Sequence, residues 1–410
     1  MIRMLVFLQL LLLASVMPGK SKAQTAYKPP QRVNNFKNIK EKIIPGADQT
    51  KLYINYLKEK NIGLVINQTS VIGKSLTLSL DSLLKLRVTV KKIYGPEHGF
   101  RGNASNGAEI NNATDRKSGL PVISLYGNKH YKPTPADLKG IDLMIFDIQD
   151  VGARFYTYLS TLQYVMEACA ENNIELMILD RPNPNGFCID GPLLDTVNRS
   201  FVGLNPIPIT YGLTIAEYAQ MLNGEGWLTN HVKCKLKIIR VANYTHHSTY
   251  KLPVSPSPNL NSEKSILLYP SVCLFEGTTI SLGRGTMFPF LQIGHPDLKG
   301  KYSYSFKPVN IPGMSEDPPQ KDKICYGIDL KNYDINSVNG DKINLTWLIE
   351  IYKAFPVKEH FFNNYFTLLA GTDKLRKQIE AGDSEKEIRA SWEPALSNYK
   401  IMRKKYLIYP

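Results

Sequence analysis

The feature that most constrains the fold is a set of short apolar runs separated by segments of helical character. The clearest runs are 62–66 (IGLVI), 143–148 (LMIFDI) and 176–179 (LMIL). Nearly continuous apolar strands are typical of a parallel sheet that is covered on both faces. Further strands are expected at 88–93, 122–125 and 232–241.

Predicted helices alternate with these strands. Residues 155–171 place Leu159, Leu162, Val165 and Met166 at helical spacing. This alternation predicts an α/β fold with a doubly wound, Rossmann-like sheet. Neither a G-x-G-x-x-G motif after the first strand nor a phosphate-binding G-x-x-x-x-G-K-[ST] motif occurs, so we expect no nucleotide or other cofactor. The other helices are expected at 76–86, 214–222, 345–354, 374–380 and 384–404.

The N-terminus has the pattern of a signal peptide. Arg3 precedes an apolar run at 5–16, and Ser21-Lys22-Ala23 supplies small residues for cleavage. The run is too short for a transmembrane helix, and no cysteine follows it, so we expect no stable membrane anchor. We therefore predict a signal peptide at 1–23 and a secreted or periplasmic protein.

The rest of the chain divides at a proline-rich stretch, residues 253–258. We expect a leader or linker at 24–43, a Rossmann-like catalytic domain at 44–255 and a C-terminal domain at 256–410. The formal net charge of +14 favours contact with anionic polymers, of which the bacterial cell wall is one. A nucleic-acid partner is not expected, because no basic run with interleaved aromatic residues occurs.

The five cysteines form no C-x-x-C pair, so a structural zinc site is not expected. We expect buried free thiols. The sequence makes no prediction about the oligomeric state.

Polar residues gather immediately after the predicted strands. In open α/β sheets, ligands bind beyond the carboxyl ends of the strands, so these residues predict a polar site there. The candidates, in chain order, are Asn67, Gln68, Glu97, His98, Arg101, Gln149, Asp150, Arg154, Tyr156 and Asn183.

This set of side chains suits glycoside hydrolysis. That reaction uses two carboxyl groups, or one carboxyl group and a group of the substrate. Glu97, between Gly95 and Gly99, is the expected general acid. Asp150 is either the second catalytic carboxyl group or the partner that holds Arg154. Nearby aromatic rings, including Tyr156, can stack on sugar faces.

A second candidate segment is 274–286 (LFEGTTISLGRGT), in which Arg284 lies between two glycines. A guanidinium binds a carboxylate through two parallel hydrogen bonds, so Arg284 suits an anionic substrate. The alternative is a turn with a solvated arginine. Glu276 is a further candidate carboxyl group in the same segment.

Several long motifs resemble a known family. They are NQTSV, YGPEHGFRG, DLMIFDIQDVGARFYTY, LDRPNPNG, ITYGLTIAEYAQMLNGEGWL, PSPNL and YPSVCLFEGTTISLGRGT. The chain resembles the exo-β-N-acetylmuramidases of the NamZ type, glycoside hydrolase family 171, formerly a family of unknown function. The likeness extends from about Ile44 to the end of the chain.

The resemblance implies a Rossmann-like domain with a smaller α/β C-terminal domain that contributes to the substrate cleft. It implies release of N-acetylmuramic acid from the non-reducing ends of peptidoglycan-derived saccharides. The glutamate of the family's G-P-E-H-G loop falls on Glu97. N-acetylmuramic acid carries a lactyl carboxylate, which a selective pocket must meet with a cation. Arg284, Arg154 and Arg101 are the candidates, and the sequence does not choose among them.

Two other functions are compatible with the same residues. A metal-dependent hydrolase of cell-wall material would use Glu97, His98, Asp147, Asp150 or His295 as ligands. No H-E-x-x-H or H-x-x-E-H motif supports it, so we expect no metal site. A non-catalytic muropeptide-binding protein would use the same cleft without turnover.

Overall fold

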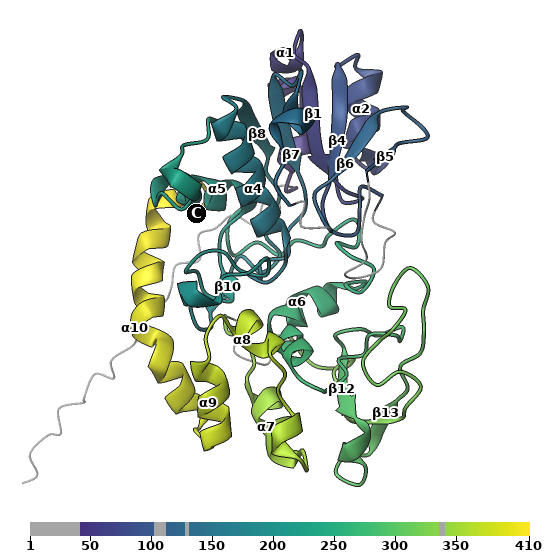
Figure 1. Ribbon diagram of the computed structural model, residues 1–410, viewed down its shortest axis with the longest axis vertical. Coiled ribbons are helices and arrows are strands. Elements are labelled where there is room, and N and C mark those ends of the chain that lie inside the picture. Colours follow the sequence, from purple (N-terminus) through teal and green to yellow (C-terminus); the bar gives the residue numbers. More distant parts are fainter. Residues whose placement is uncertain (1–41, 102–111, 128–130, 336–340) are drawn as a thin grey trace, which may run out of the picture. The chain divides into compact units, whose positions relative to one another are not determined.

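The structure is a computed structural model that describes residues 42–101, 112–127, 131–335 and 341–410 (Figure 1). The predicted signal peptide, and the predicted linker up to residue 41, lie outside the described residues.

The central element is a seven-stranded sheet with the spatial order β11-β8-β7-β1-β4-β6-β5. All neighbouring pairs are parallel except β5 and β6. Taken in chain order, the six parallel strands have the order 3-2-1-4-5-6, which is that of a Rossmann fold. The predicted fold class is therefore confirmed. The strands are β1 (Ile62–Ile66), β4 (Val90–Gly95), β5 (Ala113–Thr114), β6 (Pro121–Ser124), β7 (Leu143–Asp147), β8 (Glu175–Leu179) and β11 (Leu236–Ile239).

Strand β7 shows why the apolar runs are continuous. All five of its residues are buried. Leu143 and Ile145 belong to one hydrophobic cluster, and Met144 and Phe146 belong to another. Because successive side chains of a strand point to opposite faces, both faces of the sheet are covered.

Helices and short strands connect the sheet strands. Helix α4 begins at Tyr158, later than predicted, because residues 155–157 form the turn that follows β7. Helix α2 begins at Ser79 because the hairpin of β2 and β3 occupies the residues before it. The remaining elements of this part are α1 (Ile54–Leu57), β2 (Val71–Ile72), β3 (Thr77–Leu78), α2 (Ser79–Lys85), α3 (Pro135–Leu138), α4 (Tyr158–Glu171), β9 (Ile189–Asp190), β10 (Thr210–Tyr211) and α5 (Ile215–Gly224).

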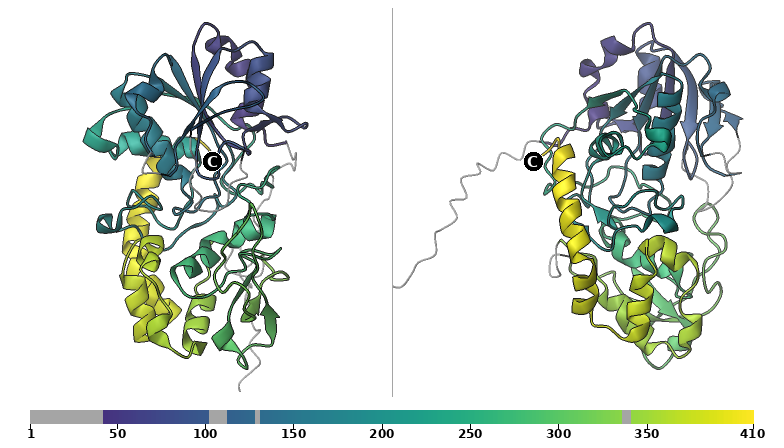
Figure 2. Two further views of the ribbon diagram at one scale, coloured as in Figure 1. Left: turned by 45° about the vertical axis from the view of Figure 1, so that its right-hand side comes forward. Right: turned by 60° about the vertical axis from the view of Figure 1, so that its left-hand side comes forward.

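The C-terminal part combines a small antiparallel sheet with helices (Figures 1 and 2). Its strands have the order β12-β14-β13. These strands and helices α6 and α8 were not predicted, whereas the predicted helices at 345–354, 374–380 and 384–404 are confirmed within a residue of each end. The elements are α6 (Glu263–Val272), β12 (Gln292–His295), β13 (Tyr304–Phe306), β14 (Cys325–Asp329), α7 (Thr346–Ala354), α8 (Tyr365–Ala370), α9 (Lys374–Ala381) and α10 (Glu385–Arg403).

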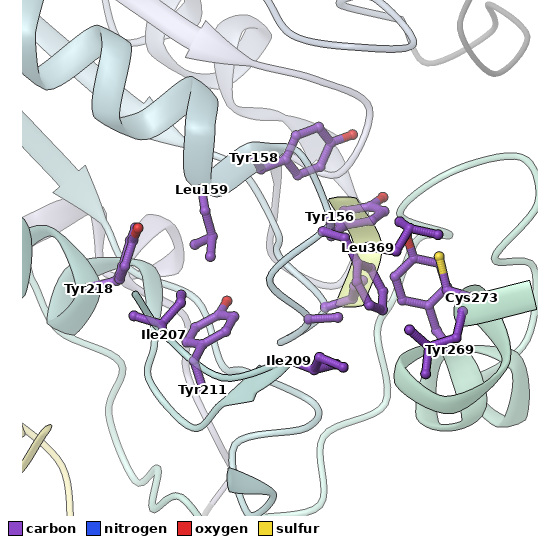
Figure 3. Close-up of a cluster of buried hydrophobic side chains, with 14 of the residues drawn as sticks. Tyr156, Tyr158, Leu159, Ile207, Ile209, Tyr211, Tyr218, Tyr269, Cys273 and Leu369 are labelled. Atoms are coloured by element: carbon purple, nitrogen blue, oxygen red, sulfur yellow. The ribbon is translucent and has the colours of Figure 1, made fainter. Parts of the chain in front are cut away.

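A shared hydrophobic core joins the two parts. One cluster runs from Phe146 in β7 through Leu159 in α4 to Leu369 in α8 and Trp392 in α10. Figure 3 shows Tyr156 and Leu369 within this cluster. Residues Lys42–Pro410 accordingly form one compact unit. The boundary at residues 255 and 256 stays a prediction.

The end of the chain is anchored on the sheet domain. The Tyr409 hydroxyl donates to Asp180 at 2.6 Å, and the backbone N–H of Ile408 donates to Glu217 Oε1 at 2.9 Å. Asp180 and Glu217 are both fully buried. A buried carboxylate is costly without donors, so the C-terminal segment stabilises both acids.

All five cysteines are buried and free, as expected. Among the described residues, no helix combines the length and hydropathy that crossing a bilayer requires.

Replacing Tyr409 tests the anchor. Tyr409→Phe removes the donor to Asp180 and also the acceptor for the backbone N–H of Val241. We expect it to lower the free energy of unfolding by about 2–4 kcal/mol, because both partners stay buried. Tyr244→Phe is the matched control, since that hydroxyl donates only to a backbone carbonyl at 3.3 Å. Urea unfolding measures both, and equal losses in the two variants would contradict the anchor.

Candidate active site

A cavity of about 450 Å³ lies where the loops after β4, β6 and β7 meet the C-terminal part. Both parts of the chain supply its wall. The first part contributes Glu97, His98, Tyr126, Tyr131, Phe155, Tyr156, Thr157, Ser200, Phe201 and Val202, and the second contributes Ser257, Leu260, Tyr269, Glu276, Arg284, Phe290, Tyr365 and Leu368.

The loop after β4 places Glu97 on this wall. It turns tightly, with a hydrogen bond from the Gly99 N–H to the Pro96 carbonyl at 2.9 Å. His98 has a φ of +67°, in the left-handed region that non-glycine residues seldom occupy. Such strain is concentrated at functional sites, where the surrounding structure holds it. The turn leaves Glu97 only 9% exposed, at the edge of the cavity.

Two neighbours fix the Glu97 carboxylate. The Thr157 hydroxyl donates to Oε2 at 2.7 Å, and Thr157 immediately precedes α4. On the other side lies Tyr126, whose pKa is raised by burial and by the nearby Glu97 carboxylate. The phenol therefore stays protonated and able to donate. The loop after β4 and the start of α4 are thus tied together through a carboxyl group that lines the cavity.

One side of the cavity is an aromatic cluster of Tyr126, Tyr131 and Phe201. The rings of Tyr131 and Phe201 are stacked with centroids 4.2 Å apart, and Tyr126 lies 5.8 Å from Phe201. All three rings are partly exposed. Partly exposed aromatic faces can hold the apolar C–H face of a sugar ring.

Another part of the wall combines aromatic edges with an ion pair. Tyr269 meets Tyr156 at 5.7 Å and Phe290 at 5.0 Å, both edge to face (Figure 3 shows Tyr156 and Tyr269). Arg284 lies over the Phe290 ring at 5.0 Å. Its Nε and Nη2 both donate to Glu276 Oε1, at 2.9 and 2.5 Å.

The ion pair keeps Arg284 charged. Burial alone acts to lower the pKa of Arg284, but the Glu276 carboxylate outweighs it and raises the pKa above its ordinary value. Tyr365 lies within the influence of both acids of the cavity. Burial raises the pKa of Tyr365, and the carboxylates of Glu276 and Glu97 raise it further. One cavity thus holds two carboxyl groups, a guanidinium and aromatic faces.

Comparison with known proteins agrees with this chemistry. Two family models match, described as the N-terminal and C-terminal domains of exo-β-N-acetylmuramidase NamZ, over residues 62–264 and 267–409. A curated protein of Bacillus subtilis (strain 168), named peptidoglycan β-N-acetylmuramidase NamZ, is 39% identical over 97% of this chain and 95% of its own. The chain belongs to the NamZ family of exo-β-N-acetylmuramidases.

Two crystal structures from Bacteroides fragilis, both described as DUF1343 family proteins, share the NamZ-family fold of this chain. The first is 46% identical with a TM-score of 0.83, and the second is 30% identical with a TM-score of 0.78. Each alignment covers 90% of this chain and 99% of the other. The resemblance stated from the sequence motifs is therefore confirmed.

Of the predicted site residues, Glu97, His98, Tyr156, Glu276 and Arg284 line the cavity of this NamZ-family chain. The predicted amides are instead part of the framework behind it. Gln68 donates to the carbonyl of Pro256 at 2.9 Å, and the Tyr156 hydroxyl donates to the same oxygen. Asn67 donates to the Tyr158 hydroxyl, Gln149 to the Pro182 carbonyl and Asn183 to the Leu213 carbonyl.

Two of the three candidate arginines lie outside the cavity wall, and their role in binding the carboxylate stays a prediction. Arg154 is 1% exposed, and its guanidinium donates to the carbonyls of Pro192, Ile207 and Leu369. Burial lowers the pKa of Arg154 to about 9. Arg101 forms an ion pair with Asp115 at 2.6 Å and leaves 45% of its side chain exposed. Neither side chain lines the cavity.

Asp150 also does not line the cavity, although we predicted a catalytic role or a bond to Arg154. Its carboxylate accepts from the Tyr211 hydroxyl and from the Gly152 N–H. Asp150 is 4% exposed and holds the turn after β7. Asp147, which the sequence offered as a possible metal ligand, accepts from Arg181 at 2.7 Å.

The sequence did not single out several wall residues. Thr157 was quoted only as part of a motif, and Tyr131, Phe201 and Tyr365 belong to segments with no recognisable site pattern. The one feature of the sequence that points to Tyr131, Phe201 and Tyr365 is that they are aromatic and lie outside the regular apolar spacing, and this feature alone does not identify a site. Among the described residues, no group of three or more His, Cys, Asp or Glu side chains converges as metal ligands do.

The role of Asp150 can be tested through the pH dependence of stability. Burial raises the pKa of Asp150 from 3.8 to about 6, although hydrogen bonds from Tyr211 and Gly152 oppose the shift. The folded protein therefore holds this proton more tightly than the unfolded chain, and the free energy of unfolding falls as pH rises through that interval. Relative to the wild type, Asp150→Asn should gain about 1–3 kcal/mol between about pH 4 and pH 7.

Urea unfolding at several pH values measures this gain. Asp317→Asn is the control, because its side chain is 92% exposed. If the difference in the free energy of unfolding between the wild type and Asp150→Asn does not change with pH, the folded protein does not raise the pKa of Asp150.

Proposed function

We propose that this chain is an exo-acting β-N-acetylmuramidase that hydrolyses terminal, non-reducing N-acetylmuramic acid from peptidoglycan glycan fragments, with Glu97 as its general acid. Family membership and the name of the Bacillus subtilis relative support the reaction. The observation that carries the role of Glu97 is its placement: a carboxyl group on the cavity wall, bound by Thr157 at the start of α4.

The reaction requires a proton at the glycosidic oxygen as the bond to the anomeric carbon breaks. Glu97 delivers that proton, and the leaving sugar departs as an alcohol. Water then supplies the hydroxyl group of the product, and its second proton restores the protonated Glu97. Thr157 and Tyr126 hold the carboxyl group in place while the proton moves.

The size of the cavity supports action at a chain end. A volume of about 450 Å³ lies in the lower part of the range for small-molecule sites, roughly 300–1,000 Å³. A site of this size suits a terminal sugar and its neighbour better than a long glycan.

We also propose that the protein is exported, because its substrate class is built outside the cytoplasm. The signal-peptide pattern at residues 1–23 supports export, and the net charge of +14 favours approach to an anionic cell wall.

A substrate series tests Glu97. In Glu97→Gln the proton donor is lost, so release from a disaccharide should fall by about 10²–10⁴-fold. A dinitrophenyl β-N-acetylmuramide has a leaving group that needs little protonation, so its release should fall far less. Steady-state rates on both substrates give the comparison.

Glu380→Gln is the control, because Glu380 forms only a surface ion pair with Arg376 on α9. Equal losses on the two substrates, with the fold intact by circular dichroism, would contradict general-acid catalysis by Glu97. Full activity of Glu97→Gln would remove the residue from the mechanism.

Export predicts a processed N-terminus. Full-length protein expressed in a bacterial host should be recovered from the periplasm or medium with Gln24 as its first residue, as read by mass spectrometry of the intact protein. Recovery from the cytoplasm with Met1 retained would contradict export.

A further inference from the structure

We infer that Arg284, held by Glu276, selects N-acetylmuramic acid over N-acetylglucosamine by binding the lactyl carboxylate. This inference rests on the proposed function, and it names the residue that gives that site its specificity.

The two sugars differ by one anionic group. N-acetylmuramic acid carries a lactyl ether on C3, and N-acetylglucosamine has a hydroxyl group there. The cavity wall already holds the carboxyl groups of Glu97 and Glu276. A third carboxyl group enters such a cavity favourably only if a cation meets it, since an uncompensated charge in a partly buried site is costly.

Arg284 supplies that cation. Among the described residues that line the cavity, no other is a lysine or an arginine. Arg101 forms an ion pair with Asp115, and Arg154 donates hydrogen bonds to three backbone carbonyls. Of the three arginines that the sequence left open, Arg284 alone is among the described residues that line the cavity.

The geometry of the guanidinium leaves a second binding edge. Glu276 accepts from Nε and Nη2, which form one edge of the planar group. Nη1 and the second hydrogen of Nη2 form the other edge, and no hydrogen bond joins Nη1 to another described residue. An arginine can bind one carboxylate on each edge through paired hydrogen bonds.

Glu276 and Phe290 position this second edge. Glu276 binds one edge of the guanidinium, and the Phe290 ring lies against its face, with its centroid 5.0 Å away. The side chains of Arg284 and Glu276 are only 12% and 19% exposed. A guanidinium fixed in this way loses little conformational freedom when it binds a ligand. A site that binds a polar group of the substrate also discriminates against an analogue without that group.

The same arrangement orients the sugar. The scissile bond is on C1 and the lactyl group is on C3, two ring carbons apart. Glu97 and Glu276 both line the same cavity of about 450 Å³. The inferred contact requires a ring with its anomeric carbon at Glu97 and its C3 side toward Arg284.

The experiment compares an aryl β-N-acetylmuramide with the matching β-N-acetylglucosaminide. In Arg284→Met, kcat/KM for the muramide should fall by at least about 100-fold, which is the range for truncating one partner of a buried charge pair. The value for the glucosaminide should change by less than about fivefold, because that sugar makes no contact with the guanidinium. Binding of the two free sugars, measured by calorimetry, should follow the same pattern.

Two further variants keep the test decisive. Arg284→Met leaves Glu276 without its partner, so Glu276→Gln/Arg284→Met provides a neutral pair, and it should lose muramide binding to the same extent. Arg101→Met tests the rival arginine and should leave the preference unchanged. Thermal unfolding checks that each variant is folded.

Loss of N-acetylmuramic acid binding with N-acetylglucosamine binding retained supports the inference. It does so even if the wild type turns over neither substrate, in which case the proposed function fails alone. Unchanged binding and turnover of the muramide in Arg284→Met overturns the role of Arg284 and leaves the proposed function standing. Equal losses for both sugars in the folded variants also overturn it, because Arg284 then acts on the shape of the cavity and not on the lactyl group.

Discussion

Parallel pairing of β4, β1 and β7 is the constraint on which the site depends. Because the three strands run in the same direction with fixed register, their carboxyl ends meet at one edge of the sheet. The loop with Glu97 leaves that edge after β4, and the segment with Thr157 leaves it after β7, on the other side of β1. The hydrogen bond between them, 2.7 Å long, then fixes the carboxyl group on the wall of the cavity.

The C-terminal part supplies the rest of the cavity wall. It covers the edge of the sheet and adds Glu276, Arg284 and Tyr365 to the wall. The shared hydrophobic core and the buried contacts of Tyr409 hold the two parts as one unit. Under the proposed function, catalysis and recognition are divided between the two parts: the sheet domain carries Glu97, the proposed proton donor, and the C-terminal part carries Arg284, the proposed contact of the substrate carboxylate.

The sequence predicted the features that depend on local pattern. The apolar runs identified β1, β7 and β8, because strands buried on both faces tolerate few polar residues. The long motifs identified the family, and the position of Glu97 after a strand placed it at the edge of the sheet. Arg284 entered as one candidate of three.

Features that depend on packing could not be predicted. Asp150 and Arg154 follow β7 as closely as Thr157 does, yet both turn into the interior, toward Tyr211 and toward backbone carbonyls. Sequence position fixes which edge of the sheet a residue is on, and packing decides which way its side chain turns.

A crystal structure of Glu97→Gln with a bound β-N-acetylmuramyl disaccharide tests the account most directly. We expect the glycosidic oxygen about 3 Å from the side chain at position 97. A separate cavity of about 750 Å³ lies between α6 and the segments 184–188 and 247–252, and a disaccharide bound there instead would contradict the account.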